Sequence, residues 1–215
     1  MYRLRVRFKR GENVKYISHL DSIRMWQRAL HRAGIALAYS EGFSPHPRIS
    51  LAAPLSIGVT SEAELMDVHL RKNTSPHFFT DAVSHQLPGD FKILQVYPIP
   101  IEQSSLQAQV RFAEYRLTVA TNKDEADIRN SINRLLALEE LPWQHQRDTG
   151  PRKYDLRALI NELRLKDYQP PYCTLDMKLR CDSSGSGRPE QVALALDLTR
   201  HPRSIHRTKL ILKTN

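Results

Sequence analysis

The sequence predicts an α+β protein made of two ferredoxin-like halves, each with an antiparallel sheet. Three observations support this fold class. Hydrophobic patterns typical of strands and helices follow one another in the order β-α-β-β-α-β over residues 1–101. The same order fits residues 114–215, and a stretch rich in Ser and Gln separates the two passes. We therefore expect an N-terminal domain over 1–101, a connector over 102–113 and a C-terminal domain over 114–215.

The first half opens with a strand and a capped helix. Residues 3–8 alternate strictly, which places three arginines on one side of a strand and apolar residues on the other. Ser18 precedes Asp21 as in a capping box, and apolar residues then recur at helical spacing up to Gly34. The other elements expected here are strands at 49–53 and 65–70, a helix that begins at Ser75-Pro76, and a strand at 91–97.

The second half repeats this order with one additional segment. Residues 124–138 carry apolar side chains at helical spacing, and Pro189 is suited to open a later helix over 189–198. The additional segment, 155–165, is expected to be helical or mixed. Strands are expected at 115–120, 143–146, 174–180 and 205–213.

The composition indicates a basic protein that binds a polyanion. Lys and Arg number 32 against 23 Asp and Glu, which gives a net charge of +9, and the pI is about 9.7. This balance favours nucleic acid as a partner, ahead of an anionic membrane surface. The longest apolar runs are far below the ~20 residues of a membrane helix, and the alternating amino terminus does not resemble a secretory signal. We therefore expect a cytoplasmic protein with no membrane partner.

The cysteine count limits the cofactors that this chain is expected to hold. Cys173 and Cys181 are too few for a disulfide framework or a four-cysteine metal or iron–sulfur site. His19, Asp21 and His46 have suitable types for a metal site, but no HxxxH, HExxH or CxxC spacing supports one. We therefore expect neither a metal nor a cofactor in this chain.

Arginines recur in patterns that predict contacts with phosphates. One set alternates along the first strand, and another recurs every four residues along the first helix, so each set occupies one face. A third basic group near the carboxyl end comprises Arg200, Arg203, Arg207, Lys209 and Lys213. A solvated surface is the alternative for each set alone, but three sets favour binding to a nucleic-acid backbone. The predicted phosphate-binding residues are Arg3, Arg5, Arg7, Arg24, Arg28 and Arg32.

The stretch from Tyr39 to Arg48 is the most unusual motif. Two prolines flank His46, restrict the backbone and present the imidazole from a stiff loop. A rigid loop whose histidine satisfies local hydrogen bonds is an equal alternative. We expect recognition by shape and phosphate contacts, or base contacts from Tyr39, Phe43 and Arg48. The candidate functional residues of the loop are Tyr39, Gly42, Phe43, Ser44, Pro45, His46, Pro47 and Arg48.

A second cluster, Ser18, His19 and Asp21, lies at the start of the first helix. Unpaired backbone N–H groups and the helix dipole favour an anion there, so a phosphate could dock on the cluster. Ordinary capping is the alternative for Ser18 and Asp21. His19 caps in neither case.

Taken together, these motifs resemble the bacterial radical-SAM-linked protein family, whose members are encoded beside or fused to a radical SAM enzyme. The specific segments are Arg-Val-Arg-Phe at 5–8, Tyr-Ile-Ser-His-Leu-Asp at 16–21 and Tyr-Ser-Glu-Gly-Phe-Ser-Pro-His-Pro-Arg-Ile-Ser at 39–50. The resemblance implies a partner enzyme that cleaves S-adenosylmethionine with an iron–sulfur cluster, while this chain holds neither. It extends to Asp67, Ser105-Leu106-Gln107-Ala108, Asp155-Leu156-Arg157 and Arg188-Pro189-Glu190.

The predicted architecture also resembles that of pseudouridine synthases, which pair two ferredoxin-like halves. Those enzymes place a catalytic aspartate in a loop after the first helix, whereas the comparable loop here contains His46 and no aspartate. The resemblance implies an RNA-binding cleft of similar shape, whereas the missing aspartate argues against pseudouridylation.

Our leading hypothesis is an accessory RNA-binding protein that works with a radical SAM enzyme in RNA modification or maturation. The alternative is a stand-alone RNA- or nucleotide-modifying enzyme of pseudouridine-synthase-like architecture, in which His46 is the general acid or base. A third hypothesis makes the 39–50 loop a docking surface for the partner enzyme.

Overall fold

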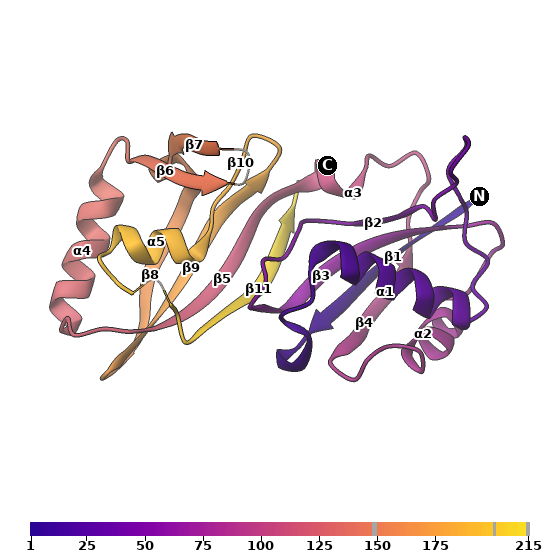
Figure 1. The fold of residues 1–215 in the computed structure, drawn as a ribbon, viewed down its shortest axis with the longest axis horizontal. Helices are drawn as coiled ribbons and strands as arrows, with labels where there is room; N and C mark the ends of the chain where they lie inside the picture. Colours follow the sequence, from indigo (N-terminus) through magenta and orange to yellow (C-terminus); the bar gives the residue numbers. More distant parts are fainter. Residues whose placement is uncertain (148–149, 200, 214–215) are drawn as a thin grey trace. The chain divides into compact units, whose positions relative to one another are not determined.

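The computed structural model describes residues 1–147, 150–199 and 201–213, which form two compact α+β units (Figure 1). Unit 1 comprises Met1–Val110 together with the residues from Leu212 onward, and unit 2 comprises Arg111–Ile211. Within the described ranges, no helix combines the length and the apolar character that a membrane span requires.

Unit 1 contains the element order β-α-β-β-α-β that the sequence predicts, with short helical turns added. In its sheet, β1 lies between β3 and β4 and is antiparallel to both, and the short β2 pairs with the far side of β3. The elements are β1 (Tyr2–Arg10), η1 (Glu12–Val14), α1 (His19–Arg32), β2 (Ile49–Leu51), β3 (Val59–Leu70), α2 (Pro76–Ser84), β4 (Phe91–Pro98) and α3 (Leu106–Gln109).

One face of this sheet forms an apolar core with α1 and α2. Phe8 on β1 and Trp26 on α1 meet edge to face, with ring centroids 4.9 Å apart, and both are buried. Phe79 on α2 joins the same cluster. The helix α1 stops where the sequence predicts, because Gly34 adopts a φ of +68°, which other residues rarely adopt.

The other face of β1 is also buried, which corrects the expectation that its first arginines face solvent. Arg5 lies directly opposite Asp67 of β3 in the antiparallel register, and its Nε is 2.7 Å from Asp67 Oδ1. Arg3 NH2 is 2.6 Å from Asp67 Oδ2. Arg3, Arg5 and Asp67 are 5%, 3% and 0% exposed. Only Arg7, further along the same face, is exposed as predicted.

Residues assigned by sequence to the connector cover these two arginines. The carbonyl oxygens of Gln103 and Ser104 accept hydrogen bonds from Arg3, at 2.6 and 3.1 Å, and Gln109 Oε1 accepts one from Arg5 at 3.1 Å. Burial works against the charge of Arg5, but hydrogen bonding and attraction to Asp67 outweigh it and raise the pKa of Arg5. Both buried guanidinium groups thus have partners, as the cost of burying a charge requires.

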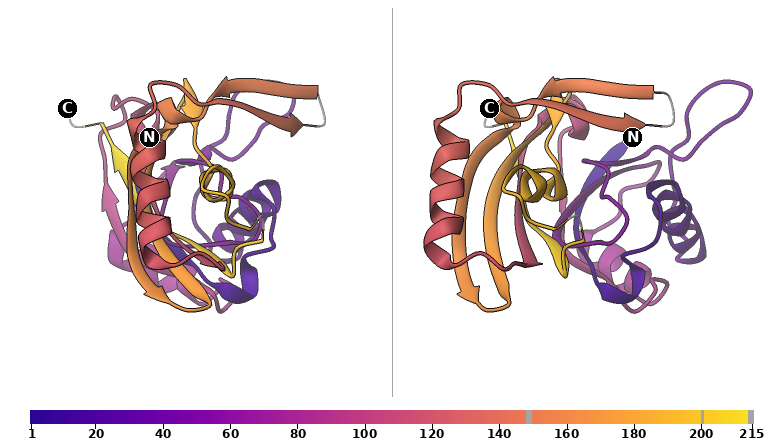
Figure 2. Two further views of the ribbon diagram at one scale, coloured as in Figure 1. Left: turned by 90° about the vertical axis from the view of Figure 1, so that its left-hand side faces the viewer. Right: turned by 60° about the vertical axis from the view of Figure 1, so that its left-hand side comes forward.

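Unit 2 is a second antiparallel arrangement, in which β9 lies between β5 and β8, and β11 neighbours β5. The hairpin of β6 and β7 is a separate two-stranded sheet that extends away from the larger one (Figure 2). The elements are β5 (Val110–Ala120), α4 (Glu125–Ala137), β6 (Pro142–Arg147), β7 (Gly150–Asp155), η2 (Arg157–Leu159), β8 (Ile160–Gln169), β9 (Tyr172–Asp182), β10 (Gly185–Ser186), α5 (Pro189–Ala195) and β11 (Ser204–Leu212).

The segment 155–165, expected to be helical or mixed, is mixed: the 3₁₀ helix η2 is followed by the first half of β8. The Asp155 carboxylate accepts N–H bonds from Leu141 and Arg157, and the Arg157 guanidinium donates to two backbone carbonyls, so the chain turns sharply here. The buried residues are Leu156, Leu159, Ile160 and Leu163. Their helical spacing arises because the turn and a bulge between Ile160 and Glu162 shift the alternation of the strand.

Replacing the buried carboxylate should destabilise unit 1 strongly. In Asp67→Asn, two buried guanidinium groups lose their counter-charge, and breaking a buried ion pair typically costs about 3–5 kcal/mol. The control Glu125→Gln removes an exposed ion pair with Arg129 on α4, and it should cost less than about 1 kcal/mol. Urea unfolding followed by circular dichroism compares the two variants. Equal losses would contradict the central role of Asp67.

Candidate nucleic-acid interface

The first turn of α1 is a capped helix start whose side chains are already engaged. Ser18 Oγ accepts the Asp21 N–H at 3.1 Å and donates to the Asp21 carboxylate at 2.7 Å. Arg24 pairs with the same carboxylate at 3.1 Å. The Ser18 hydroxyl first, and then Arg24, lower the pKa of Asp21. Ordinary capping therefore accounts for both Ser18 and Asp21.

An arginine that sequence reasoning missed holds the loop before α1. Arg10 is buried, and its guanidinium donates to the carbonyls of Val14 at 3.1 Å, Lys15 at 2.9 Å and Ile17. Its side chain thereby replaces water for backbone groups that no strand or helix satisfies. The signal was present in the sequence, since Arg10 shares the parity of the apolar residues of β1 and not that of Arg7.

His19 lies half-buried beside charged groups of the sheet. It lines a small pocket with Ser22, Glu64 and Arg10. Burial lowers the pKa of His19, the negative charge of Glu64 opposes that shift, and the positive charge of Arg10 adds to it. The structure therefore favours a neutral imidazole here, which could accept or donate a hydrogen bond without carrying charge.

The arginines of α1 differ in what they contact. Arg32 donates to both the side chain and the backbone oxygen of Gln86, at 3.0 and 2.7 Å, so it fastens α1 to the segment after α2. Arg24 is exposed but paired with Asp21. Arg28 is exposed, and it has no hydrogen-bond or ion-pair partner among the residues that the structure describes. The predicted basic face thus offers Arg24 and Arg28 to a ligand, with Arg32 largely committed.

The loop from Tyr39 to Arg48 has a hydrogen-bonded root. Tyr39 and Pro47 form an antiparallel bridge, and the Ser40 N–H donates to the His46 carbonyl at 2.8 Å. The His46 N–H donates back to Ser40 Oγ at 3.0 Å, and the Arg48 N–H donates to the Ala38 carbonyl at 2.8 Å. These bonds, together with the two prolines, hold the loop at its base.

The tip of the loop projects into solvent, as the purple loop in the right panel of Figure 2 shows. Gly42 has a φ of +114° and open space around its α-carbon. Phe43 is 108% exposed, which for a large apolar side chain at a loop tip is unusual. Ser44, Pro45 and His46 are exposed beside it. An aromatic ring in this position is available to a ligand on both faces.

The structure does not gather the candidate residues into a metal or catalytic centre. Within the described ranges, no three His, Cys, Asp or Glu side chains are placed to hold a metal ion. The His46 imidazole is exposed and has no hydrogen-bond partner among described residues, so nothing there orients it as an acid or base. Cys173 is buried, and burial raises the pKa of its thiol.

The third basic group is dispersed. Arg200 lies outside the described residues. Arg203 stacks over the Tyr172 ring at 4.7 Å from its centroid, and Arg207 is buried. Lys209 and Lys213 are exposed.

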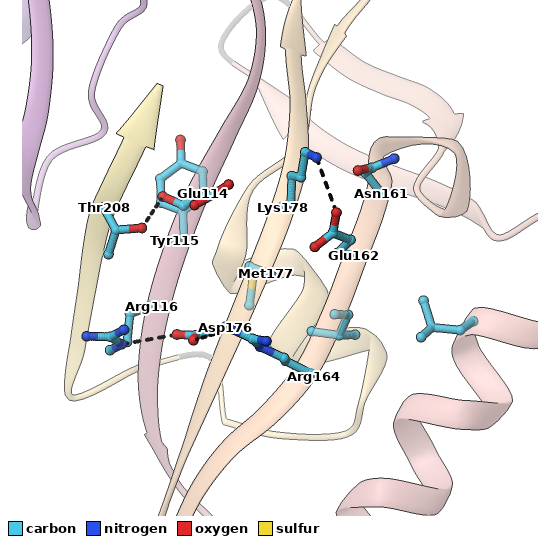
Figure 3. A pocket seen from close by; sticks show the side chains of 12 residues that line it. Glu114, Tyr115, Arg116, Asn161, Glu162, Arg164, Asp176, Met177, Lys178 and Thr208 are labelled. Atoms are coloured by element: carbon cyan, nitrogen blue, oxygen red, sulfur yellow. Dashed lines mark hydrogen bonds and ion pairs between the residues drawn. The ribbon is translucent and has the colours of Figure 1, made fainter. Parts of the chain in front are cut away.

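A groove of about 550 Å³ crosses the sheet of unit 2, and its charges are balanced (Figure 3). Asp176 on β9 pairs with Arg116 at 3.0 Å on one side and with Arg164 at 3.3 Å on the other. Lys178 pairs with Glu162 at 3.2 Å. Because its cations and anions neutralise one another, this groove is a solvated sheet face and a poor site for a polyanion.

Comparison with known proteins gives a family and a fold. The model of a family described as "Uncharacterized protein conserved in bacteria (DUF2344)" matches residues 3–189. No curated protein matches the sequence at a significant level. The structure is similar to a chain in the "Crystal Structure of a Cbf5-Nop10-Gar1 Complex", with a TM-score of 0.55 and 9% identity. That match covers 96% of this chain and 48% of the other, so this chain spans about half the length of the solved one.

Two further solved structures show the same kind of partial match. One is an archaeal box H/ACA sRNP Nop10–Cbf5 complex, with a TM-score of 0.48, 10% identity, and 95% and 46% of the two chains covered. The other is an H/ACA RNP bound to a substrate RNA containing 2'-deoxyuridine, with a TM-score of 0.48, 10% identity, and 96% and 47% covered. The match at a TM-score of 0.55 confirms the predicted α+β arrangement, which resembles that of pseudouridine synthases.

Acid should destabilise the protein partly through His19. Because burial lowers its pKa below the ordinary 6.5, the unfolded chain binds more protons than the folded chain once the pH falls below that value. The stability that comes from the neutral ring is therefore present at neutral pH and lost in acid. Urea midpoints measured from about pH 7 to pH 5 should fall less in His19→Gln than in the wild type.

The matched control for this measurement is His31→Gln, which changes an exposed histidine on the same helix. It should leave the pH dependence as it is in the wild type. Burial also lowers the pKa of His69, so His19→Gln should retain part of the slope. A wild-type slope in His19→Gln would contradict the burial of a neutral imidazole.

Proposed function

The chain belongs to the DUF2344 family of uncharacterized bacterial proteins, and we propose that it binds RNA as an accessory protein of an RNA-modifying or RNA-maturing enzyme. The observation that carries this proposal is Phe43, a fully exposed aromatic ring at the tip of a loop whose root is fixed. Bases stack on such rings with little dependence on sequence, and a fixed root reduces the entropy lost on binding.

Charge supports the same assignment. The net charge is +9, and Arg7, Arg24 and Arg28 of unit 1 are exposed to solvent. Guanidinium groups neutralise phosphates and release counterions, which supplies most of the affinity for an unspecified nucleic acid. Arg3 and Arg5 are withdrawn from this set because Asp67 holds them in the interior.

The solved structures show a shared fold and do not identify the nucleic acid. At 9% identity, such a similarity establishes the fold and nothing more. The RNA assignment therefore depends on the exposed ring and the charge.

The partner enzyme is proposed from the sequence motifs. The Tyr16–Asp21 and Tyr39–Ser50 segments resemble proteins encoded with radical SAM enzymes, in which the partner supplies S-adenosylmethionine and the iron–sulfur cluster. In this proposal the present chain holds the RNA in the cytoplasm, and the partner performs the chemistry.

The exposed ring gives a direct test of RNA binding. Phe43→Ala should weaken binding to a 12-nucleotide oligouridylate by about 5- to 150-fold, which corresponds to the 1–3 kcal/mol of one base-stacking contact. Fluorescence anisotropy measures the affinity. Phe78→Ala is the matched control, because Phe78 is a 56% exposed aromatic on α2 with no proposed role.

Salt dependence completes this test. The affinity of the wild type should fall with salt by about 0.7 log units per phosphate contact per log unit of salt, as single strands require. Phe43→Ala should keep that slope, because it removes no charge. Binding that ignores salt, or equal losses in Phe43→Ala and Phe78→Ala, would count against RNA binding by this loop.

The partner proposal predicts a specific pair of crosslinked molecules. Crosslinking of the tagged protein in cells, followed by sequencing of bound RNA and mass spectrometry of bound protein, should recover an RNA together with an iron–sulfur enzyme that uses S-adenosylmethionine. RNA without such an enzyme would remove the partner from the proposal and leave RNA binding intact. The Phe43→Ala variant should give fewer RNA crosslinks and should retain its crosslinks to the enzyme.

A further inference from the structure

A small pocket in unit 2 is formed between the β6–β7 hairpin and the start of α5. The pocket is lined by His145 on β6, Arg152 and Tyr154 on β7, Ser186 on β10 and Arg188 at the N-terminal boundary of α5. Arg188 opens the Arg-Pro-Glu segment, which carries part of the family resemblance and which the function proposed above does not use.

Hydrogen bonds hold the walls of this pocket in place. One Arg188 NH group lies 3.2 Å from His145 Nε2. A guanidinium can only donate, so Nε2 is the acceptor in this hydrogen bond. The Tyr154 hydroxyl donates to Gln191 Oε1 on α5. These two bonds tie the hairpin to the helix and leave most of the donors of Arg188 unused.

Positive charge in the pocket is not neutralised as it is elsewhere in unit 2. Among described residues, neither Arg152 nor Arg188 forms an ion pair with a carboxylate. Burial raises the pKa of Tyr154, and Arg188 and Arg152 oppose that shift, which places both guanidinium charges near its hydroxyl. The negative charge of Glu190 acts on Tyr154 in the opposite direction and raises its pKa.

Asp182, which precedes the lining residues of the β10 segment in the sequence, is already committed to other partners. Asp182 accepts the N–H of Ser184 at 2.9 Å and pairs with Arg180 at 3.2 Å. In the groove of Figure 3, by contrast, each arginine has a carboxylate partner. Among the described residues, the pocket is therefore lined by two guanidinium groups and no carboxylate, and the N–H donors of these groups meet no acid.

We propose that this pocket binds a phosphate group of RNA. Arg152 and Arg188 would grip the phosphate oxygens, since a guanidinium presents paired donors that match them. The Ser186 hydroxyl, whose described contact is a long one of 4.0 Å to Cys181 Sγ, is available as a further donor. This assignment rests on the proposed function and adds a phosphate-binding position in unit 2 to the base-stacking loop in unit 1.

The first experiment compares RNA affinity in variants of the pocket. Arg188→Gln and the double variant Arg152→Gln/Arg188→Gln should weaken binding to the 12-nucleotide oligouridylate by about tenfold or more, because each removes a charge-assisted hydrogen bond to phosphate. The salt slope should also fall, by about 0.7 for each phosphate that the variant no longer neutralises. Arg164→Gln is the matched control, because that exposed guanidinium already pairs with Asp176.

The second experiment follows the His145 ring by NMR during titration with inorganic phosphate. The resonance should shift in the wild type and not in the double variant, and equal thermal midpoints would show that both proteins are folded. No shift, with RNA affinity unchanged in the double variant, overturns the pocket while RNA binding by the wild type keeps the proposed function. A phosphate-induced shift without any effect of the variants on RNA identifies a site for free phosphate and overturns the RNA assignment. Failure of the wild type to bind RNA at all sinks the proposed function and this assignment together.

Discussion

The carboxylate of Asp67, shared by Arg3 and Arg5, is the constraint on which unit 1 depends. Burying two guanidinium groups with one carboxylate leaves an excess positive charge, and unpaired buried charge is very costly. The carbonyl dipoles of Gln103 and Ser104 and the amide of Gln109 compensate for it. The chain after β4 must therefore lie against the face of the sheet that carries these arginines. The helices α1 and α2 pack on the opposite, apolar face.

The described arginines have several distinct uses, and those without a carboxylate partner fit a polyanionic ligand best. Some guanidinium groups stabilise buried charge, as Arg5 does, and others tie backbone carbonyls in turns, as Arg10 and Arg157 do. Those of the unit 2 groove neutralise Asp176. Arg28 and Arg188 are different, because neither meets a carboxylate among the residues described. Net charge alone does not separate these uses, whereas the partner of each guanidinium does.

The hydrophobic pattern was sufficient to predict the element order of unit 1, because its helices and strands carry apolar residues at periodic spacing and recognisable caps or turns separate them. It could not predict the environment of Arg3 and Arg5, because that depends on the register that sets Asp67 opposite them and on coverage by residues 103–109. At 155–165 the pattern left a helical or a mixed segment open, and the chain there is a short 3₁₀ helix followed by a strand with a bulge. The loop motif was visible in sequence, but the exposure of Phe43 and the pocket at Arg188 required coordinates.

In the loop from Tyr39 to Arg48, the residues that stabilise the fold are separate from the residues that are exposed to a ligand. Its backbone bonds lie at the root, while Gly42 and Phe43 contact little of the body of unit 1. Replacing the tip therefore leaves the free energy of folding almost untouched. Such a segment can change its ligand during evolution without destabilising the scaffold. Differences among relatives at the tip would then reflect changes of ligand. Differences at the root would instead reflect the requirements of folding.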